Sequence, residues 1–256
     1  MKITILGCGG AGGVPMVSRG WGECDPQNPK NRRRRPSILI DNDGTLILVD
    51  TSPDMREQFL ACGVRRLDAV LYTHAHADHI HGIDDLRELN RAMNGPLDVF
   101  GHPDVLRELN RRFSYVFAPL DDLNYPFYKP WLIPREITGP FHVNGLEITP
   151  FEQDHGYGIS LGYRLGSFAY STDAVELSEA AFETLKGISV WIVGCFTDKV
   201  HRTHAHTDKV LGWIERVRPK RAVLTHMGPG LDYEALKALL PPGVEPAFDG
   251  MEIDVA

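Results

Sequence analysis

A short polar motif, Thr73-His74-Ala75-His76-Ala77-Asp78-His79, follows the apolar segment Ala69–Tyr72 and carries the strongest chemical signal in the chain. His74 and His76 are two positions apart, so in an extended loop both imidazoles point to one side. Asp78 and His79 are adjacent and diverge. Without a bound ion, such a dense set of polar side chains at a strand end would need several costly partners. The spacing therefore predicts two neighbouring metal sites.

Further candidate ligands stand where later apolar runs end. His155 follows the segment ITPFEQD, Asp173 follows FAYST, and His226 follows AVLT. With the first motif they make five histidines and two aspartates. This nitrogen and oxygen set suits Zn²⁺, Mn²⁺ or Fe²⁺, and it lacks the thiolate that would select zinc. The identity of the metal is left open.

The order of these motifs resembles the metallo-β-lactamase superfamily, whose mark is H-x-H-x-D-H followed by spaced His, Asp and His. Within that superfamily the chain is similar to the PhnP-type phosphodiesterases over nearly its whole length. The shared features are a glycine-rich start, the T-H-x-H-x-D-H loop, Arg33–Ser37, Ser171–Asp173, Leu224–His226 and Phe248–Ile253. The resemblance implies a single α/β domain over residues 1–256, folded as a four-layer αββα sandwich.

The resemblance also implies how the ligands are divided between two ions. One ion is held by His74, His76 and His155, the other by Asp78, His79 and His226, and Asp173 bridges them. Two divalent ions per chain, Mn²⁺ or Zn²⁺, are the expected cofactors. Related proteins often carry a cysteine-rich cluster that resembles a structural zinc site. Here Gly20–Asp25 contains only Cys24, so that additional zinc is expected to be missing.

His206 and Asp78 are the candidate catalytic residues. The segment Thr203–Asp208 nearly repeats the first motif, but Lys209 stands where the fourth ligand would be. By the resemblance, His206 matches the histidine that protonates the leaving group, and the alternative is a surface histidine near a helix N-terminus. His204 is a weaker candidate, for a substrate contact.

Two features near the N-terminus invite a binding role. Gly7–Gly12 spells G-x-G-x-x-G after a strand, but the glycines and prolines that follow exclude the helix that a dinucleotide site requires. Arg32–Arg35 is a run of four arginines before a strand, so at most two of them face one site. A solvated face is the default interpretation of such a run, and Arg35 is the candidate for a phosphate contact.

The elements that must position these residues follow one another without a linker or an internal repeat. Strands are predicted at Lys2–Gly7, Ser37–Asp41, Thr45–Asp50, Ala69–Thr73, Leu146–Gln153, Ile159–Leu165, Phe168–Ser171, Val190–Gly194, Ala222–Thr225 and near Ile253. Helices are predicted at Ser52–Ala61, Ile80–Met93, Pro103–Phe113, Ser178–Lys186, Thr207–Val217 and Asp232–Leu240. Phe117–Pro140 shows neither period, and a lid or substrate wall and a plain surface excursion are equal alternatives there.

Composition narrows the class of partner. With 256 residues, 43% hydrophobic and 24% charged, the chain has the make-up of a packed globular domain. The net charge of −7 argues against a wide basic face for long nucleic acid. No apolar run is long enough for a membrane span, and the separated cysteines form no CxxC pair, so a cytoplasmic protein is expected. The expected partner is a small phosphorylated substrate, with nucleotides among the candidates, and a homodimer is left open.

Two divalent ions about 3.5–4 Å apart can deprotonate a bridging water and take up charge on a phosphoryl oxygen. We therefore predict a metal-dependent hydrolase, foremost a phosphodiesterase acting on small or cyclic nucleotide-like esters. In this mechanism the metal-bridging hydroxide attacks phosphorus and His206 protonates the departing alkoxide. The alternatives are a thioesterase or lactonase, or an RNase Z-like nuclease, of the same superfamily, and a metal-binding sensor module without catalysis.

Overall fold

The first half of the chain supplies most of a seven-stranded sheet in the order β15-β1-β2-β3-β4-β5-β6. The computed structural model describes residues 1–120 and 128–256. The strands of this sheet are β1 (Lys2–Gly7), β2 (Ser37–Asn42), β3 (Thr45–Val49), β4 (Ala69–Leu71), β5 (Leu97–Gly101), β6 (Leu132–Glu136) and β15 (Glu252–Asp254). β1, β2 and β3 are antiparallel neighbours, whereas β3 to β6 are parallel neighbours. The residues that follow β3 and β4 therefore leave the sheet at one edge.

The second half builds an eight-stranded sheet in the order β11-β8-β9-β10-β12-β13-β14, with β7 beside β8. Its strands are β7 (Phe141–Val143), β8 (Leu146–Asp154), β9 (Ile159–Leu165), β10 (Phe168–Ser171), β11 (Glu176–Leu177), β12 (Val190–Gly194), β13 (Arg221–Thr225) and β14 (Val244–Pro246). β10, β12, β13 and β14 are parallel neighbours. The loops after β10 and β13 consequently meet at the same edge.

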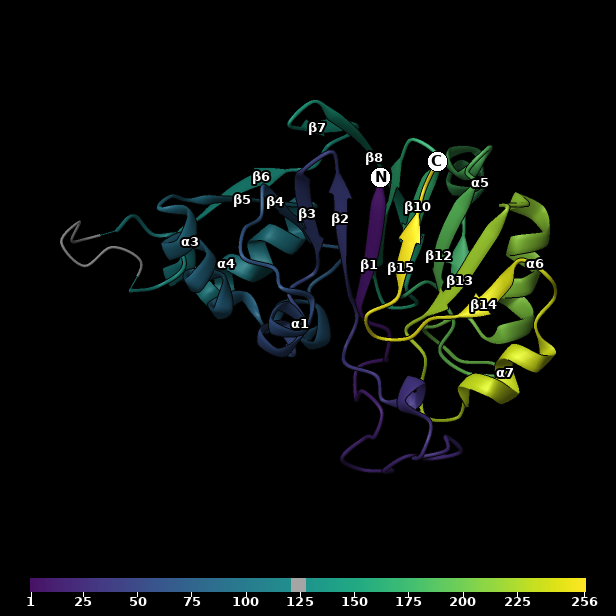
Figure 1. Cartoon of the computed structure of the whole chain (residues 1–256). Coiled ribbons are helices and arrows are strands. Elements are labelled where there is room, and N and C mark those ends of the chain that lie inside the picture. Colours follow the sequence, from purple (N-terminus) through teal and green to yellow (C-terminus); the bar gives the residue numbers. More distant parts are fainter. Residues whose placement is uncertain (121–127) are drawn as a thin grey trace.

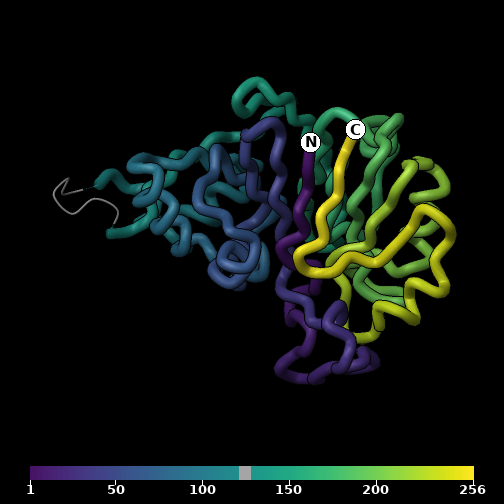
Figure 2. Tube along the Cα trace, in the orientation of Figure 1, coloured from purple at the N-terminus to yellow at the C-terminus, as the bar shows by residue number. Residues whose placement is uncertain are grey.

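Helices cover the outer faces of both sheets, as Figure 1 shows. α1 (Met55–Cys62), α3 (Leu86–Met93) and α4 (Pro103–Phe117) lie beside the first sheet, and α5 (Glu179–Leu185), α6 (Thr207–Val217) and α7 (Tyr233–Leu239) lie beside the second. The two ends of the chain lie side by side, as Figure 2 shows, because β1 pairs with β15. Among the helices of the described residues, none has the length and apolar character needed to cross a membrane.

Alternating side chains along the strands build two cores. In β2, Ile38 and Ile40 belong to the core that both sheets share with Tyr163 and Ile192. Leu39, on the opposite face of β2, belongs to the core beneath the helices of the first sheet. Because successive residues of a strand point to opposite faces, both faces of β2 are buried. This arrangement confirms the four-layer αββα sandwich.

The helix predicted over Ile80–Met93 is wrong in its first part. The structure has a short helix α2 (Ala77–Ile80), a 3₁₀ turn η2 (Ile83–Asp85) and then α3. A Cβ atom on Gly82 would overlap the carbonyl oxygen of Ser52. The chain turns at Gly82, where only glycine allows this close approach.

The segment Phe117–Pro140 contains β6, which the sequence did not predict. β6 is an edge strand whose residues are mostly outside the core, and it includes Pro134. Proline is tolerated at sheet edges, and a largely exposed strand shows no clear alternation. Residues 121–127 lie outside the described residues, so the lid interpretation stays a prediction for that part.

Gly7 and Gly212 provide a matched test of packing at the end of β1. A Cβ on Gly7 would overlap the carbonyl oxygen of Arg35, whereas a Cβ on Gly212, inside α6, would meet nothing within 4 Å. We expect Gly7→Ala to lower the free energy of unfolding by about 1–3 kcal/mol. Gly212→Ala should raise it by about 0.5–1 kcal/mol through helix propensity. Urea denaturation of both variants checks this pair, and equal effects of the two would contradict it.

Candidate metal centre

Four loops at one edge of the sheets supply the polar cluster. The loop after β4 carries His74, and the loops after β8, β10 and β13 carry His155, Asp173 and His226. β8 and β10 lie on either side of β9, each antiparallel to it, so they run in the same direction. The strand ends therefore bring together residues that are up to 152 positions apart, with His226 Nε2 3.2 Å from Asp173 Oδ2 and His76 Nδ1 3.2 Å from His155 Nε2.

Three of the convergent residues have left-handed backbone conformations. The φ angles are 64° at Asp50, 51° at Asp173 and 57° at His226. Residues other than glycine adopt this region at a cost of about 1–3 kcal/mol, and such strain clusters at functional sites. Each of the three stands just after a strand, where a reversal of the chain turns the side chain toward the edge of the sheet. The backbone is thus shaped around the cluster.

The structure brings all seven sequence-predicted ligands into groups that can each hold a metal ion, and it adds His204. In each group the ligand atoms lie within 4.8 Å of one another. The groups are His74, His76 and His155; His74, His79 and Asp173; Asp78, His79 and His226; and His155, Asp173 and His204. Most of these side chains are buried, and His76 is exposed. Among the groups, Asp173 and His79 link the two predicted halves of the site.

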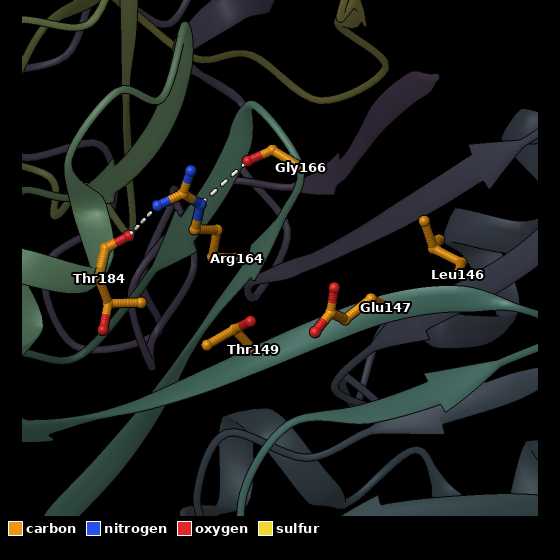
Figure 3. Close-up of a pocket in the computed structure, with 6 residues that line it drawn as sticks. All are labelled: Leu146, Glu147, Thr149, Arg164, Gly166 and Thr184. Atoms are coloured by element: carbon orange, nitrogen blue, oxygen red, sulfur yellow. Dashed lines mark hydrogen bonds between the residues drawn. The ribbon is translucent and has the colours of Figure 1, made fainter.

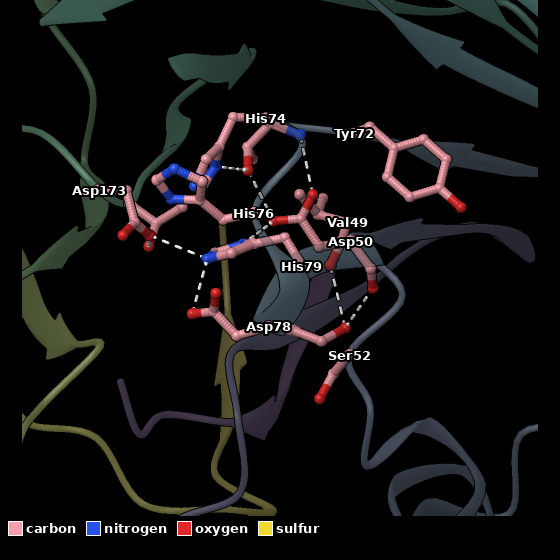
Figure 4. Close-up of polar contacts among 12 residues, drawn as sticks. Val49, Asp50, Ser52, Tyr72, His74, His76, Asp78, His79 and Asp173 are labelled. Atoms are coloured by element: carbon pink, nitrogen blue, oxygen red, sulfur yellow. Dashed lines mark hydrogen bonds and ion pairs between the residues drawn. The ribbon is translucent and has the colours of Figure 1, made fainter. Parts of the chain in front are cut away.

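Asp173 offers one carboxylate oxygen to each side of the cluster. Its Oδ2 lies 3.1 Å from His79 Nε2 and 3.2 Å from His226 Nε2. Its Oδ1 lies 2.8 Å from His204 Nε2 and 3.8 Å from His155 Nε2. Figure 4 shows the imidazole of His79 between the carboxylates of Asp173 and Asp78. A carboxylate with its two oxygens divided in this way has the geometry of a bridging ligand.

Hydrogen bonds fix which nitrogen of each imidazole faces the cluster. His79 Nδ1 lies 2.6 Å from Asp50 Oδ2, and His155 Nδ1 lies 2.7 Å from the carbonyl oxygen of Thr203. An acceptor at Nδ1 places the proton there, which leaves the Nε2 lone pair free to bind a metal. The buried Nε2 atom of His74 has no hydrogen-bond partner in the described structure, and that of His79 lies 3.2 and 3.1 Å from carboxylate oxygens of Asp78 and Asp173. Unpartnered buried nitrogens beside carboxylates are what a metal centre requires, so these residues fit divalent ions.

The charge states of the cluster also suit a metal. Burial lowers the pKa of His74 well below 6.5 and that of His155 to about 4, so both imidazoles are neutral at pH 7. Burial opposes ionisation of Asp173, yet His226 and His79 hold its pKa well below 3.8. Burial also disfavours a charged His79, but Asp78 and Asp173 raise its pKa well above 6.5. The carboxylates thus favour a positive charge at the centre of the group, where a cation would bind.

The structure places His204 beside this cluster. His204 Nε2 faces Asp173, and its Nδ1 lies 2.8 Å from Thr203 Oγ1. His206 stands at the N-cap of α6 and its backbone bridges to Thr197. Its side chain makes no hydrogen bond or ion pair with any described residue. The assignment of the proton donor to His206 stays a prediction, and the contact of His204 with Asp173 makes His204 a second candidate.

Two arginines of the run Arg32–Arg35 have different surroundings: Arg33 lies in the interior and Arg35 forms an ion pair. Arg33 is fully buried and donates to the carbonyl oxygens of Gly228 and Leu231. Arg35 forms an ion pair with Asp54, with 3.0 Å between Nη2 and Oδ1. The predicted phosphate contact of Arg35 would have to compete with that carboxylate. The solvated-face interpretation is wrong for Arg33, which ties the N-terminal loop to the loop after His226.

Sequence reasoning missed Asp50, a buried residue whose carboxylate contacts His79 and Thr73. Its carboxylate is fully buried and accepts hydrogen bonds from Thr73 N and Thr73 Oγ1 at 2.8 Å, in addition to its contact with His79. Like the chosen ligands, Asp50 directly follows an apolar run that forms a strand. That signal was available, but no neighbouring histidine marked the position. Asp50 holds His79 and the start of the T-H-x-H-x-D-H loop in place.

Comparison with known proteins identifies the family. Residues 45–227 match the model of the beta-lactamase superfamily domain. The chain is 34% identical over 256 residues to an octanoyltransferase of Porphyromonas gingivalis, an alignment that covers 98% of this chain and 51% of that protein. A solved diphosphatase from the PhnP family has 32% identity and a TM-score of 0.91, with 100% of this chain and 98% of that chain covered. Zn²⁺-bound PqqB from Methylobacterium extorquens has 21% identity and a TM-score of 0.76, with 100% of both chains covered.

The chain therefore belongs to the metallo-β-lactamase superfamily, whose fold it shares over its whole length. It is similar in particular to the PhnP-family diphosphatase, which confirms the resemblance in the sequence motifs. It spans about half the length of the octanoyltransferase that it matches. The chain thus has the fold of this superfamily, and its His and Asp groups are suited to binding metal ions.

Asp50→Asn tests the support behind His79. The side-chain amide of asparagine has one oxygen and one NH₂ group, so it can no longer accept hydrogen bonds at both former carboxylate positions. The hydrogen bond that orients the His79 imidazole is therefore weakened or lost. We expect the dissociation constant for Zn²⁺ to rise about 10- to 100-fold, the usual effect of losing such a partner. Competition titration against a chromophoric chelator measures the change, and Asp43→Asn, at an exposed turn, is the control. An unchanged zinc affinity in a folded Asp50→Asn protein would refute this role.

Proposed function

We propose that this protein is a binuclear phosphodiesterase that hydrolyses small, nucleotide-like phosphodiesters. The observation that carries the proposal is the position of Asp173, whose two oxygens face two separate groups of metal ligands. The likeness to a PhnP-family diphosphatase, at 32% identity over the full chain, supports phosphoryl chemistry over thioester or lactone chemistry. The proposed partner is accordingly a small phosphorylated molecule in the cytoplasm.

The cluster divides naturally into two ligand sets around Asp173. His74, His76 and His155 would hold one ion, and Asp78, His79 and His226 would hold the other. Two divalent ions, Zn²⁺ or Mn²⁺, supply a hydroxide nucleophile at neutral pH and neutralise charge on the phosphoryl oxygens. Asp78 is buried against His79 and His226, with Oδ2 3.2 and 3.4 Å from their Nε2 atoms, which supports a ligand role for it.

We assign proton transfer to His204. Its side chain is 18% exposed at the edge of the cluster, so a substrate can reach it, whereas Asp173 beside it is 2% exposed. Thr203 Oγ1 at Nδ1 and Asp173 Oδ1 at Nε2 fix the ring in the loop before α6. An alkoxide is a poor leaving group, and a histidine at this position can protonate its oxygen as the bond to phosphorus breaks.

The reaction class is tested by a panel of substrates with the metal content measured alongside. We expect protein reconstituted with Zn²⁺ or Mn²⁺ to contain two ions per chain and to hydrolyse bis(p-nitrophenyl) phosphate. A thioester and a lactone should react far more slowly, and chelation should abolish phosphodiester hydrolysis because the nucleophile depends on the ions. Faster thioester or lactone hydrolysis would reassign the substrate class, and one ion per chain in excess metal would exclude the binuclear centre. A loaded protein inert on all three substrates would favour a sensor module.

His204→Ala and His206→Ala separate the two candidate proton donors. We expect His204→Ala to lower kcat on diesters with alkyl leaving groups by about 10²–10⁴, the usual contribution of a general acid. Its loss on p-nitrophenyl esters should be small, because p-nitrophenolate departs without a proton. His206→Ala should leave both rates nearly unchanged.

Metal analysis completes this comparison. Both variants should retain the metal content of the unaltered protein. Loss of an ion in His204→Ala would instead make His204 a ligand, as the group His155, Asp173 and His204 allows. A leaving-group-dependent loss in His206→Ala would return the proton donor to that residue.

A further inference from the structure

A groove opens beside the metal cluster between α4 and the turn from β8 to β9. Its volume is about 330 Å³, the size of a site for part of a small molecule. His74, His76 and His155 form its inner end. One wall comes from α4 and the residue before it, and the other from the turn at residues 157–159. We call this cavity the α4 groove.

The turn presents an unpaired aromatic ring to the groove. The side chain of Tyr157 is 84% exposed, and it makes no hydrogen bond with any described residue. The turn itself is held in place, because Gly156 N donates to Asp154 Oδ1 at 2.7 Å and His155 N donates to the carbonyl oxygen of Gly158 at 2.9 Å. Ile159 and Val105 add apolar surface to the groove. A solvent-exposed ring on a hydrogen-bonded turn, beside apolar side chains, offers stacking surface to a planar ligand.

The charges on the α4 wall argue against a second phosphate in the groove. Arg112 is its only arginine among the described lining residues, and its Nε lies 2.5 Å from Glu108 Oε1. Arg112 also donates from Nη1 to the carbonyl oxygen of Ala75 at 3.0 Å. Asp104 adds a further carboxylate to the same wall. An anionic group would meet these carboxylates without a free cation, so the groove suits an uncharged part of the substrate.

His102 adds a directed polar group to this wall. Its Nδ1 accepts a hydrogen bond from Asp104 N at 3.2 Å. In the neutral ring the proton is then on Nε2, which has no partner among the described residues and can donate to a ligand. A heterocycle carries acceptor atoms on its edge, whereas an aliphatic chain does not. Stacking surface together with an edge donor is the combination that recognises a nucleobase.

Another hollow of the molecule offers no comparable site. It is lined by Leu146, Glu147, Thr149, Arg164, Gly166 and Thr184, with no residue of the metal cluster (Figure 3). Arg164 donates to the carbonyl oxygens of Gly166 and Thr184 at 3.0 and 2.6 Å, so its guanidinium is already engaged. The α4 groove, in contrast, is lined by His74, His76 and His155, so a ligand bound at the cluster can extend into it.

We propose that the α4 groove binds the nucleobase of the substrate, stacked on Tyr157, while the phosphate lies at the metal cluster. This proposal rests on the proposed function, because it assumes that the metal cluster binds the phosphate of the substrate. The base lies on the side of His74, His76 and His155, in a groove whose lining does not include His204. Tyr157 is a specificity residue in this arrangement and takes no part in bond breaking.

The test is calorimetric titration of the zinc-loaded protein with AMP, ribose 5-phosphate and octyl phosphate. AMP and ribose 5-phosphate share the phosphate and the sugar, so the difference between them reports the base. We expect AMP to bind at least about 10-fold more tightly than ribose 5-phosphate. Tyr157→Ala should weaken AMP binding about 5- to 150-fold, the range of base stacking, and leave ribose 5-phosphate unaffected. Tyr157→Phe should keep most of the affinity for AMP, and Leu239→Ala, at an exposed position on α7, should change nothing.

Several results would overturn the groove assignment. These are undetectable AMP binding, equal affinities for AMP and ribose 5-phosphate, equal effects of Tyr157→Ala on both, or tighter Tyr157-dependent binding of octyl phosphate. The last result would identify an aliphatic chain as the occupant. Phosphodiester hydrolysis is measured separately on the same preparations. A base preference without hydrolysis would overturn the proposed function alone, whereas hydrolysis without a base preference would overturn the groove alone.

Discussion

Burial of the Asp173 carboxylate among imidazoles is the constraint on which the rest of the site depends. The side chain is 2% exposed and has histidine nitrogens on both of its oxygens. A buried carboxylate is costly unless positive charge compensates it, and the histidines that surround it are held by partners of their own. Asp50 supports His79, and the carbonyl oxygen of Thr203 supports His155. The cluster is thus a set of oriented lone pairs around a position that requires a cation.

The packed sandwich brings the ligand side chains together and offsets the strain of the left-handed residues among them. Both faces of β2 and the inner face of the second sheet are covered, so strand positions are fixed by packing on two sides. Rigid strands can end in left-handed residues such as Asp173 and His226 without loosening, because the strain is small compared with the burial around it. The same packing explains why Gly7 and Gly82 have no room for a side chain where loops cross close to strands.

Much of the fold and the ligand set could be predicted because the signals were local. The ligands stand at or shortly after the ends of apolar runs, and α6 was predicted with the bounds that it has, Thr207–Val217. The contact of His204 with Asp173 could not be predicted from local signals, since the two residues are 31 positions apart. β6 escaped prediction because an edge strand with exposed residues and a proline carries no period. Asp50 escaped because its partner His79 is 29 positions away.

In the proposed arrangement, the metal cluster and the α4 groove differ in charge and would bind different parts of the substrate. The proposed position of the phosphate is the cluster, where bound metal ions would supply the positive charge that a protein with a net charge of −7 lacks overall. The arginine of the α4 groove is paired with Glu108, so the proposed base would gain affinity there through surface and shape. Arg112 joins the two, because it belongs to the groove wall and donates to Ala75, which lies between His74 and His76. The groove wall and the loop that carries two of the metal ligands are therefore joined by a direct hydrogen bond, so the position of the proposed base site relative to the metal ligands is fixed by α4 itself.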